Sequence, residues 1–235
     1  MKIAVCVSGQ PRSYAKGYEY LKKNVLDHYD TDIFIHTWKN KVYDTKDVID
    51  LYKPVDYITD ELSIFDKTKL DSKYTNTPDP EKFPPSNMVY AYYSLFQSCL
   101  LKIKNEIVNK QYDWVIKTRF DYAINGVIPF DKMDKTKIYI PNCRTVITRD
   151  FGNDQFAFGS SLVMNKYMST YHMMEDYYND GYQMNGEEML KATLRTNNLI
   201  GENLCYVNMN NPFPAGPYNG GKHSLIRDDM ELWKN

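Results

Sequence analysis

The sequence predicts an α/β domain in which helices flank a mixed, mostly parallel central sheet. Short apolar runs rich in β-branched and aromatic residues alternate with segments whose apolar residues recur every three or four positions. The runs at 2–7 and 114–118 are apolar without strict alternation, which is typical of strands buried on both faces. A length of 235 residues suits one such unit, so we expect a single domain over residues 1–235.

The first part of the chain repeats a strand–helix pattern. A strand at 2–7 leads through a tight polar loop into a helix at 14–29, for which Ser13 is the expected N-cap. A second strand follows at 32–37, where isoleucine and phenylalanine are bounded by polar residues. The same reasoning predicts, in order, a helix at 45–52 and a strand at 55–59.

The middle of the chain holds the longest helical pattern. Residues 66–86 are polar and proline-rich without periodicity, so we expect a loop there, with a substrate-ordered lid as one possible role. Beyond it, apolar residues recur at helical spacing from Met88 to Ile107, which predicts a helix at 87–109 with one stripe facing the core. This helix leads directly into the strand at 114–118.

The remaining elements are shorter. Two strands are expected at 126–130 and 137–140, and a third at 156–158 is entered through polar residues. Helical spacing then predicts helices at 161–178 and 185–196, ahead of a turn-rich C-terminal loop and tail at 209–235.

The composition restricts the classes of partner. The 29 basic and 30 acidic residues nearly cancel and do not run in blocks, so we expect no binding of nucleic acid. No apolar run reaches the length of a membrane span and the first apolar run is too short for a signal peptide, so we expect no integral membrane segment and a cytoplasmic location. Four cysteines without a Cys-x-x-Cys pair are expected to be reduced packing residues: Cys6, Cys99, Cys143 and Cys205.

The stretch at 112–121 is the strongest candidate for a functional site, because a buried strand ends there in Arg119 and Asp121. Side chains two residues apart on an extended chain point the same way, so these two can project together into one site. A cation beside a carboxylate suits a diphosphate and its metal. An ordinary ion pair that caps the strand is the structural alternative.

A second candidate is the loop after the first strand, which contains Ser8, Gly9, Gln10 and Arg12. In open α/β sheets ligands collect at the carboxyl ends of strands, where a helix N-terminus offers N–H groups to anions. Gly9 permits close approach and Arg12 supplies positive charge. Trp38 follows the second strand on the same rim, where it could stack on a base or sugar or simply cover the core.

Four segments carry a family resemblance: Ser-Gly-Gln-Pro-Arg at 8–12, the stretch at 112–121 with its preceding helix, Asn-Asp-Gln-Phe-Ala-Phe-Gly at 153–159, and Gly-Glu-Glu at 186–188. Together they resemble small GT-A-type glycosyltransferases of bacterial lipopolysaccharide and capsule synthesis, and their counterparts in large viruses and phages. The resemblance covers most of residues 1–208. It implies a GT-A-like, Rossmann-like fold with a nucleotide-binding half at 1–125 and an acceptor and sugar half at 126–208.

The resemblance also implies a nucleotide-sugar donor and a glycan or polysaccharide acceptor. In these enzymes the first loop holds the nucleotide, and an Asp-x-Asp motif holds a divalent metal, Mn²⁺ or Mg²⁺, on the diphosphate. Here the motif reads Arg119-Phe120-Asp121, so only Asp121 is left as a metal ligand, and the guanidinium can bind diphosphate itself. In the tail, Lys222 is a candidate for the diphosphate and His223 for the metal.

Glycosyl transfer places negative charge on the departing diphosphate, and an inverting enzyme needs a carboxylate to take the acceptor's proton. Asp154 is the first candidate for this base, with Glu187 or Glu188 behind it. The resemblance suggests that the segment of Asp154 and Gln155 lies across the donor sugar, where Gln155 would bind sugar hydroxyls and Asp154 could equally do so instead of acting as the base. A retaining mechanism would need no such base.

Two alternatives from other classes remain. Pro-Arg-Ser at 11–13 is similar to the phosphosulfate-binding loop of sulfotransferases, which use phosphoadenosine phosphosulfate, although Tyr14-Ala15 stands where that loop continues with a pair such as Gly-Thr. Abundant tyrosine and the altered Asp-x-Asp motif also suit a non-catalytic carbohydrate-binding protein.

Overall fold

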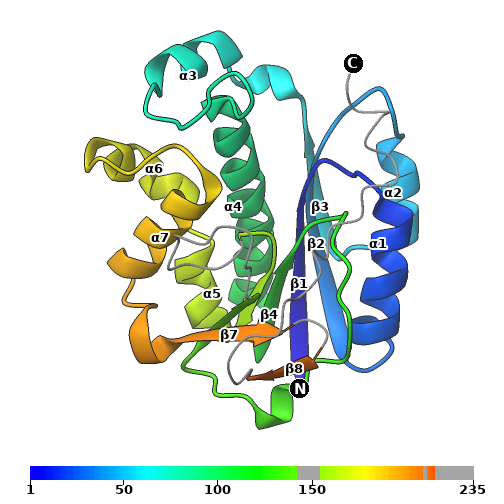
Figure 1. Cartoon of the computed structure of the whole chain (residues 1–235). Coiled ribbons are helices and arrows are strands. Elements are labelled where there is room, and N and C mark those ends of the chain that lie inside the picture. The colour runs from blue at the N-terminus through cyan, green and yellow to red at the C-terminus, as the bar shows by residue number, and fades with distance from the viewer. Residues whose placement is uncertain (142–153, 209–210, 215–235) are drawn as a thin grey trace.

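The computed structural model describes residues 1–141, 154–208 and 211–214. In this part of the chain one eight-stranded sheet has the order β3-β2-β1-β4-β6-β5-β7-β8 (Figure 1). Its strands are β1 (Lys2–Gly9), β2 (Asp30–Trp38), β3 (Asp56–Asp60), β4 (Trp114–Thr118), β5 (Ile138–Pro141), β6 (Ala157–Gly159), β7 (Leu204–Asn208) and β8 (Asn211–Pro214).

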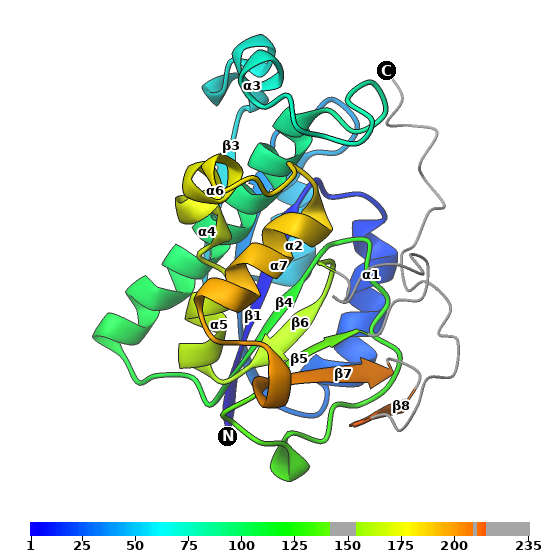
Figure 2. The ribbon, with the colours of Figure 1, turned by 60° about the vertical axis from the view of Figure 1, so that its left-hand side comes forward.

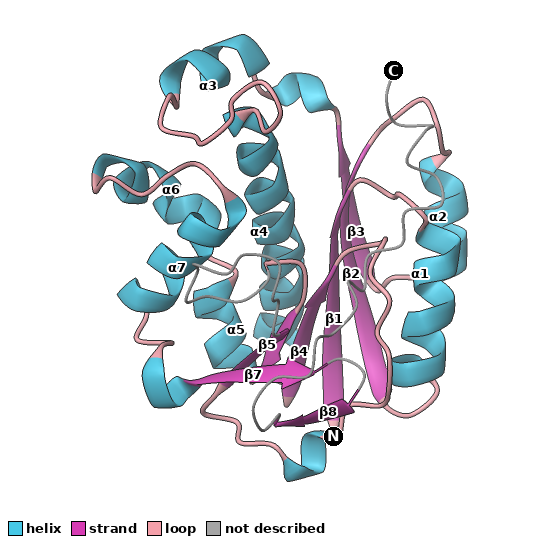
Figure 3. Ribbon diagram, viewed as in Figure 1, coloured by secondary structure: helices cyan, strands magenta, loops and turns pink. Residues whose placement is uncertain are grey.

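Helices cover both faces of the sheet (Figure 3). The α-helices are α1 (Tyr14–Leu21), α2 (Thr45–Tyr52), α3 (Lys67–Lys73), α4 (Pro85–Val108), α5 (Ser161–Tyr167), α6 (Thr170–Asn179) and α7 (Gly186–Thr196). A π-helical turn at Lys22–Leu26 continues α1, and 3-10 turns lie at Leu62–Ile64, Phe130–Lys132 and Gly201–Asn203. None of the described helices is long and apolar enough to cross a bilayer.

The sheet is parallel from β3 through β2 and β1 to β4, and then changes direction at β6. β1 pairs in parallel with both β2 and β4, whereas β6 is antiparallel to its neighbours β4 and β5. β5 and β7 are parallel again, and β8 is antiparallel at the edge. The predicted α/β class, with a mixed and mostly parallel sheet flanked by helices, is therefore confirmed.

Two hydrophobic clusters lie on opposite faces of the sheet. The strand residues Ile3, Val5 and Val7 pack with α1 and α2 on one face, and Ala4 and Cys6 pack with α4 on the other. This alternation follows from the period of two in a strand, and both faces need apolar cover because helices lie on each. On the α4 side, α5 packs against β6 and β4, and α7 packs against α5 and α6 (Figure 2).

Several predicted elements need correction. Residues 126–130 form no strand, since apolar side chains such as Ile128 are buried there without a paired neighbour strand. The helix expected at 161–178 is two helices, α5 and α6, which are separated at Met168 and Ser169. The loop expected at 66–86 begins with the helix α3.

The first helix also differs in its cap. Ser13 occupies the N-cap position of α1, but its φ of 46° is left-handed and its side chain makes no capping hydrogen bond. Later in the chain, the strands β7 and β8 continue the sheet, whereas the sequence pattern predicts no strand after residue 196.

Candidate functional site

The candidate site lies at the carboxyl ends of the neighbouring strands β1 and β4, where the chain connections run on opposite faces of the sheet. From β1 the chain crosses to α1 on one face of the sheet, whereas α4 on the other face leads into β4 (Figure 1). Such a switch point is where open α/β sheets place their ligands. Because Val7 pairs with Thr118, the loop after Gly9 and the segment after Thr118 leave the sheet side by side.

Arg119 and Asp121 form a bidentate ion pair at the end of β4. Arg119 Nε and Nη2 donate to Asp121 Oδ1 and Oδ2, each at 2.8 Å. The Asp121 side chain is 1% exposed and that of Arg119 is 33% exposed, so the guanidinium forms the open side of the pair. Burial acts against the charge on Arg119, but Asp121 and the nearby Asp154 raise its pKa above the ordinary value. The two side chains expected to project together do so.

Close contact between Phe120 and helix α1 fixes the position of this segment. A Cβ placed on Gly17 would lie 1.8 Å from the Phe120 carbonyl oxygen, so only glycine fits there. Tyr52 of α2 packs its ring edge on Phe120 and donates a hydrogen bond to the carbonyl of Tyr14, at 2.9 Å. Two helices therefore hold the backbone that carries Arg119 and Asp121.

Asp154 lies against the first residue of α7. A Cβ on Gly186 would meet Asp154 Oδ2 at 2.5 Å, which shows how closely the carboxylate approaches the helix N-terminus. Lys117 of β4, 5% exposed, donates from Nζ to the main-chain carbonyl of Asp154. Desolvation lowers the pKa of Lys117 to about 8, although Asp154 partly opposes this shift. Asp154 is thus placed beside Lys117 of β4 and near Arg119, which follows the strand.

The other predicted residues of this half lie around Asp154. Gln155 follows it and is half-buried, and Glu187 follows Gly186 in the first turn of α7. Glu188 faces Lys191 on the same helix, with 3.5 Å between Oε1 and Nζ, and its N–H is capped by Asn185. Glu188 is therefore engaged within its own helix.

The loop after β1 is held by its own side chains. Arg12 donates from Nε and Nη2 to Gln10 Oε1, at 3.0 and 2.6 Å. Gly9 has φ +107° and faces open space, while Ser8 is buried. The N–H of Gly9 donates to Ser94 Oγ at 2.7 Å, which ties the loop to α4.

A buried histidine near the end of β2 supports this loop. His36 Nδ1 lies 2.8 Å from Ser94 Oγ, and His36 Nε2 lies 3.1 Å from Asp60 Oδ2. Tyr93 also donates to Asp60, at 2.9 Å. Burial lowers the pKa of His36, while hydrogen bonding and proximity to Asp60 oppose the shift. The network links the ends of β1, β2 and β3 to α4.

Trp38 is 2% exposed, so it presents no open ring face in this conformation. Its ring packs edge-on against Tyr90 at 5.3 Å and lies tilted beside Tyr93 at 5.6 Å between centroids. Stacking of Trp38 on a base or sugar would require these rings to move. The geometry favours the alternative that Trp38 covers the core.

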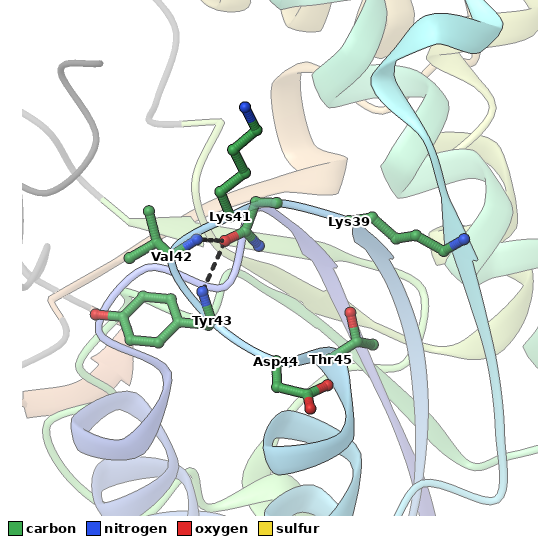
Figure 4. Close-up of a pocket in the computed structure, with 7 residues that line it drawn as sticks. Lys39, Lys41, Val42, Tyr43, Asp44 and Thr45 are labelled. Carbon is green, nitrogen blue, oxygen red and sulfur yellow. Dashed lines mark hydrogen bonds between the residues drawn. The ribbon is translucent and has the colours of Figure 1, made fainter.

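The loop that follows Trp38 forms a hollow of about 500 Å³ at the same edge of the sheet, lined by residues 39–45 (Figure 4). Asn40 Oδ1 shapes this loop by accepting from the N–H groups of Val42 and Tyr43, at 2.8 and 2.9 Å. The ring of Tyr43 meets that of Tyr14, at 5.2 Å between centroids. The loop therefore adjoins the start of α1, a position that its polar sequence did not indicate.

The described residues do not make up a metal site by themselves. Both oxygens of Asp121 accept from Arg119, and among these residues no group of three or more His, Cys, Asp or Glu is placed to hold a metal ion. Lys222 and His223 lie outside the described residues. Ligation of a metal by Asp121 and His223 stays a prediction.

Comparison with solved structures gives a distant likeness to the galactosyltransferase LgtC. The structure of LgtC with donor and acceptor sugar analogs is 10% identical, with 88% of this chain and 73% of that chain covered and a TM-score of 0.46. An active-site mutant of LgtC gives the same identity and coverage and a TM-score of 0.48. Similarity at this level identifies neither an activity nor a substrate.

Sequence comparison is more specific about family than about function. No curated protein matches the chain. Residues 1–214 match the family described as Domain of unknown function (DUF7796). Because this match spans most of its length, the chain belongs to the DUF7796 family.

Proposed function

We propose that the protein is a glycosyltransferase that moves a sugar from a nucleotide-sugar donor to a hydroxyl group of a glycan or polysaccharide. The observation that carries this proposal is the Arg119–Asp121 pair at the β1/β4 switch point, with the Asp154 carboxylate close to it. A cation for a leaving diphosphate and a carboxylate for an acceptor proton are the two groups that the reaction requires.

In the proposed reaction an acceptor hydroxyl attacks the anomeric carbon of the donor sugar. A new C–O bond forms, the bond from that carbon to the diphosphate oxygen breaks, and the diphosphate leaves with the electron pair. Asp154 takes the proton of the hydroxyl. Arg119 stabilises the departing diphosphate, because its Nη1 group is not used in the pair with Asp121 and a guanidinium binds phosphate oxygens in a fixed geometry.

Other residues have supporting roles in this proposal. Arg12, oriented by Gln10, adds positive charge on the β1 side, where Gly9 leaves open space for the nucleotide. Glu187 is the alternative base, because it follows the glycine that Asp154 contacts. Asp121 acts by holding Arg119, so we propose that turnover does not depend strictly on Mn²⁺ or Mg²⁺.

Ligand-induced stabilisation tests the donor class, because a ligand that binds only the native state raises the melting temperature. The panel is UDP, GDP, CMP, dTDP and phosphoadenosine phosphosulfate, each with Mn²⁺ and with EDTA. A shift with one nucleoside diphosphate or monophosphate supports the proposal. A shift only with phosphoadenosine phosphosulfate would point to a sulfotransferase, and a shift only with free sugars to a binding protein.

Turnover tests the chemistry itself. Release of nucleotide from the matching nucleotide sugar, with water or an oligosaccharide as acceptor, is expected for the wild type in EDTA as well as in Mn²⁺. Asp154→Asn is expected to lower kcat by roughly 10²–10⁴-fold while nucleotide binding persists. Asp176→Asn, an exposed carboxylate of α6, is the control. Full activity of Asp154→Asn would exclude Asp154 as the base.

A further inference from the structure

Lys117 is a lysine in the interior of a core strand. It lies in β4 between Cys6 of β1 and Ala157 of β6, and it is 5% exposed. Placing an ammonium group among apolar neighbours is unfavourable, and an apolar residue of similar volume often serves stability as well or better. The presence of lysine at this position therefore calls for a reason other than packing.

The surroundings of Lys117 point to the candidate site. Its Nζ donates to the main-chain carbonyl of Asp154, and the charged groups that act on it are Arg119, Asp121 and Asp154. On the opposite side of Asp154, Gly186 leaves room for the carboxylate. The hydroxyl of the buried Tyr92 donates to the Gly186 carbonyl at 2.7 Å. A chain of contacts thus joins β4, Asp154 ahead of β6, α7 and α4.

We propose that Lys117 is a positioning residue that fixes the Asp154 carboxylate relative to Arg119, an inference that rests on the proposed glycosyl transfer. Lys117 lies in β4 and Arg119 follows its last residue, Thr118, so the hydrogen bond to the Asp154 carbonyl ties the proposed base to the backbone that carries the proposed phosphate ligand. A displacement of about 1 Å between such groups can cost on the order of 10²-fold in rate.

The proposal separates the effect of Lys117 on activity from its effect on stability. Lys117→Met removes the buried ammonium and keeps the volume, so its melting temperature is expected at or above that of the wild type. Its kcat for hydrolysis of the nucleotide sugar is expected to fall at least about 10-fold, because the Asp154 segment loses its anchor. The KM for the donor is expected within about 3-fold of wild type, because Lys117 is placed behind Asp154 and not at the diphosphate.

A second variant distinguishes the hydrogen bond from the charge. Lys117→Gln retains an N–H donor for the Asp154 carbonyl, so it is expected to recover part of the kcat that Lys117→Met loses. Because the neutral amine also keeps an N–H for this carbonyl, the wild type and Lys117→Gln are expected to have parallel pH profiles of kcat above about pH 8, where Lys117 loses its proton. Lys135→Met, at a half-exposed lysine that pairs with Asp113 just before β4, is the matched control.

Either of two results would overturn the inference. One is wild-type kcat in Lys117→Met. The other is a lower melting temperature in both variants, with kcat reduced only in proportion to the fraction of protein that is folded. In that case Lys117 would stabilise the fold and have no separate role in positioning Asp154. If the wild type neither binds nor hydrolyses any nucleotide sugar, the proposed function fails. The melting temperature of Lys117→Met then still decides whether lysine is kept at a cost to stability.

Discussion

Substitution of Gly17 by alanine tests how the Arg119–Asp121 segment is held. The new Cβ would lie 1.8 Å from the Phe120 carbonyl oxygen, whereas contacts below 3.0 Å are essentially never seen for Cβ atoms. The two backbones would therefore have to separate by at least 1.2 Å. Because the neighbour is main chain, no rotation of a side chain can relieve the contact.

Two opposing terms set the size of the effect. Alanine in a helix is favoured over glycine by about 1 kcal/mol, and overpacking of a tight contact costs about 1–3 kcal/mol or more. We expect the unfolding free energy of Gly17→Ala to fall by about 1–2 kcal/mol, which corresponds to a melting temperature lower by roughly 2–8 °C. A shift of about 1 Å at Arg119 is expected to reduce kcat/KM on the order of 10²-fold.

Urea denaturation measures the stability, and nucleotide release measures the activity. Ala15→Gly, at an exposed position of the same helix, is the control for helix propensity, and it is expected to lower stability without a comparable loss of kcat/KM. A Gly17→Ala protein that is more stable than the wild type and equally active would refute the argument. The contact of Phe120 with α1 would then have no part in placing Arg119.

Three further predictions concern the same site. Arg119→Lys is expected to weaken nucleotide binding at least about 10-fold and to lower the unfolding free energy by about 1–3 kcal/mol. The reason is that an ammonium group cannot donate to both oxygens of buried Asp121 in the geometry of a guanidinium. An unchanged nucleotide affinity in calorimetry would contradict this prediction. The pKa of His36 is lowered by burial, so the unfolded chain binds more protons and the unfolding free energy is expected to fall as the pH drops through about 6.5. Urea titrations at several pH values should show a weaker dependence of this free energy on pH for His36→Gln. An equal dependence in both proteins would count against burial of His36 as the cause. In Gly186→Ala the new Cβ meets only the end of the Asp154 side chain, which can rotate away. The unfolding free energy is therefore expected within about 1 kcal/mol of wild type, while kcat falls about 10-fold. An unchanged kcat would argue against Asp154 as the base.

Most elements of the fold could be predicted because their patterns are local. The helix at 45–52 and the strand at 114–118 have the predicted limits, since apolar spacing and flanking residues define them without help from the rest of the chain. The strand predicted at 126–130 was wrong for a physical reason. Burial of alternate residues such as Ile128 produces the same pattern as a strand, but pairing depends on a partner that the pattern does not contain.

The candidate site could be predicted in part. The i, i+2 spacing correctly indicated that Arg119 and Asp121 lie together, although the strand ends at Thr118 and the pair forms in the turn that follows it. Ser94 is a polar residue of the long helix, yet it is buried and holds Gly9, since its neighbours come from β1 and β2. Lys117 gave a visible signal, a lysine inside an apolar run, and Gly17 gave another, a glycine inside a helix. What each of them contacts depends on long-range packing.

The antiparallel pairing of β6 with β4 has a consequence for how the sequence can change in length. Ala157 pairs with Lys117, and Asp154 stands three residues ahead of it. Adding or deleting one residue between Asp154 and Ala157 would alter the turn at residues 154–155 and shift the carboxylate relative to Lys117 by up to about 3.3 Å, the length of one extended residue. Length changes before Asp154 leave this offset untouched. Among homologous chains, the count of residues from this aspartate to the strand is therefore expected to be constant.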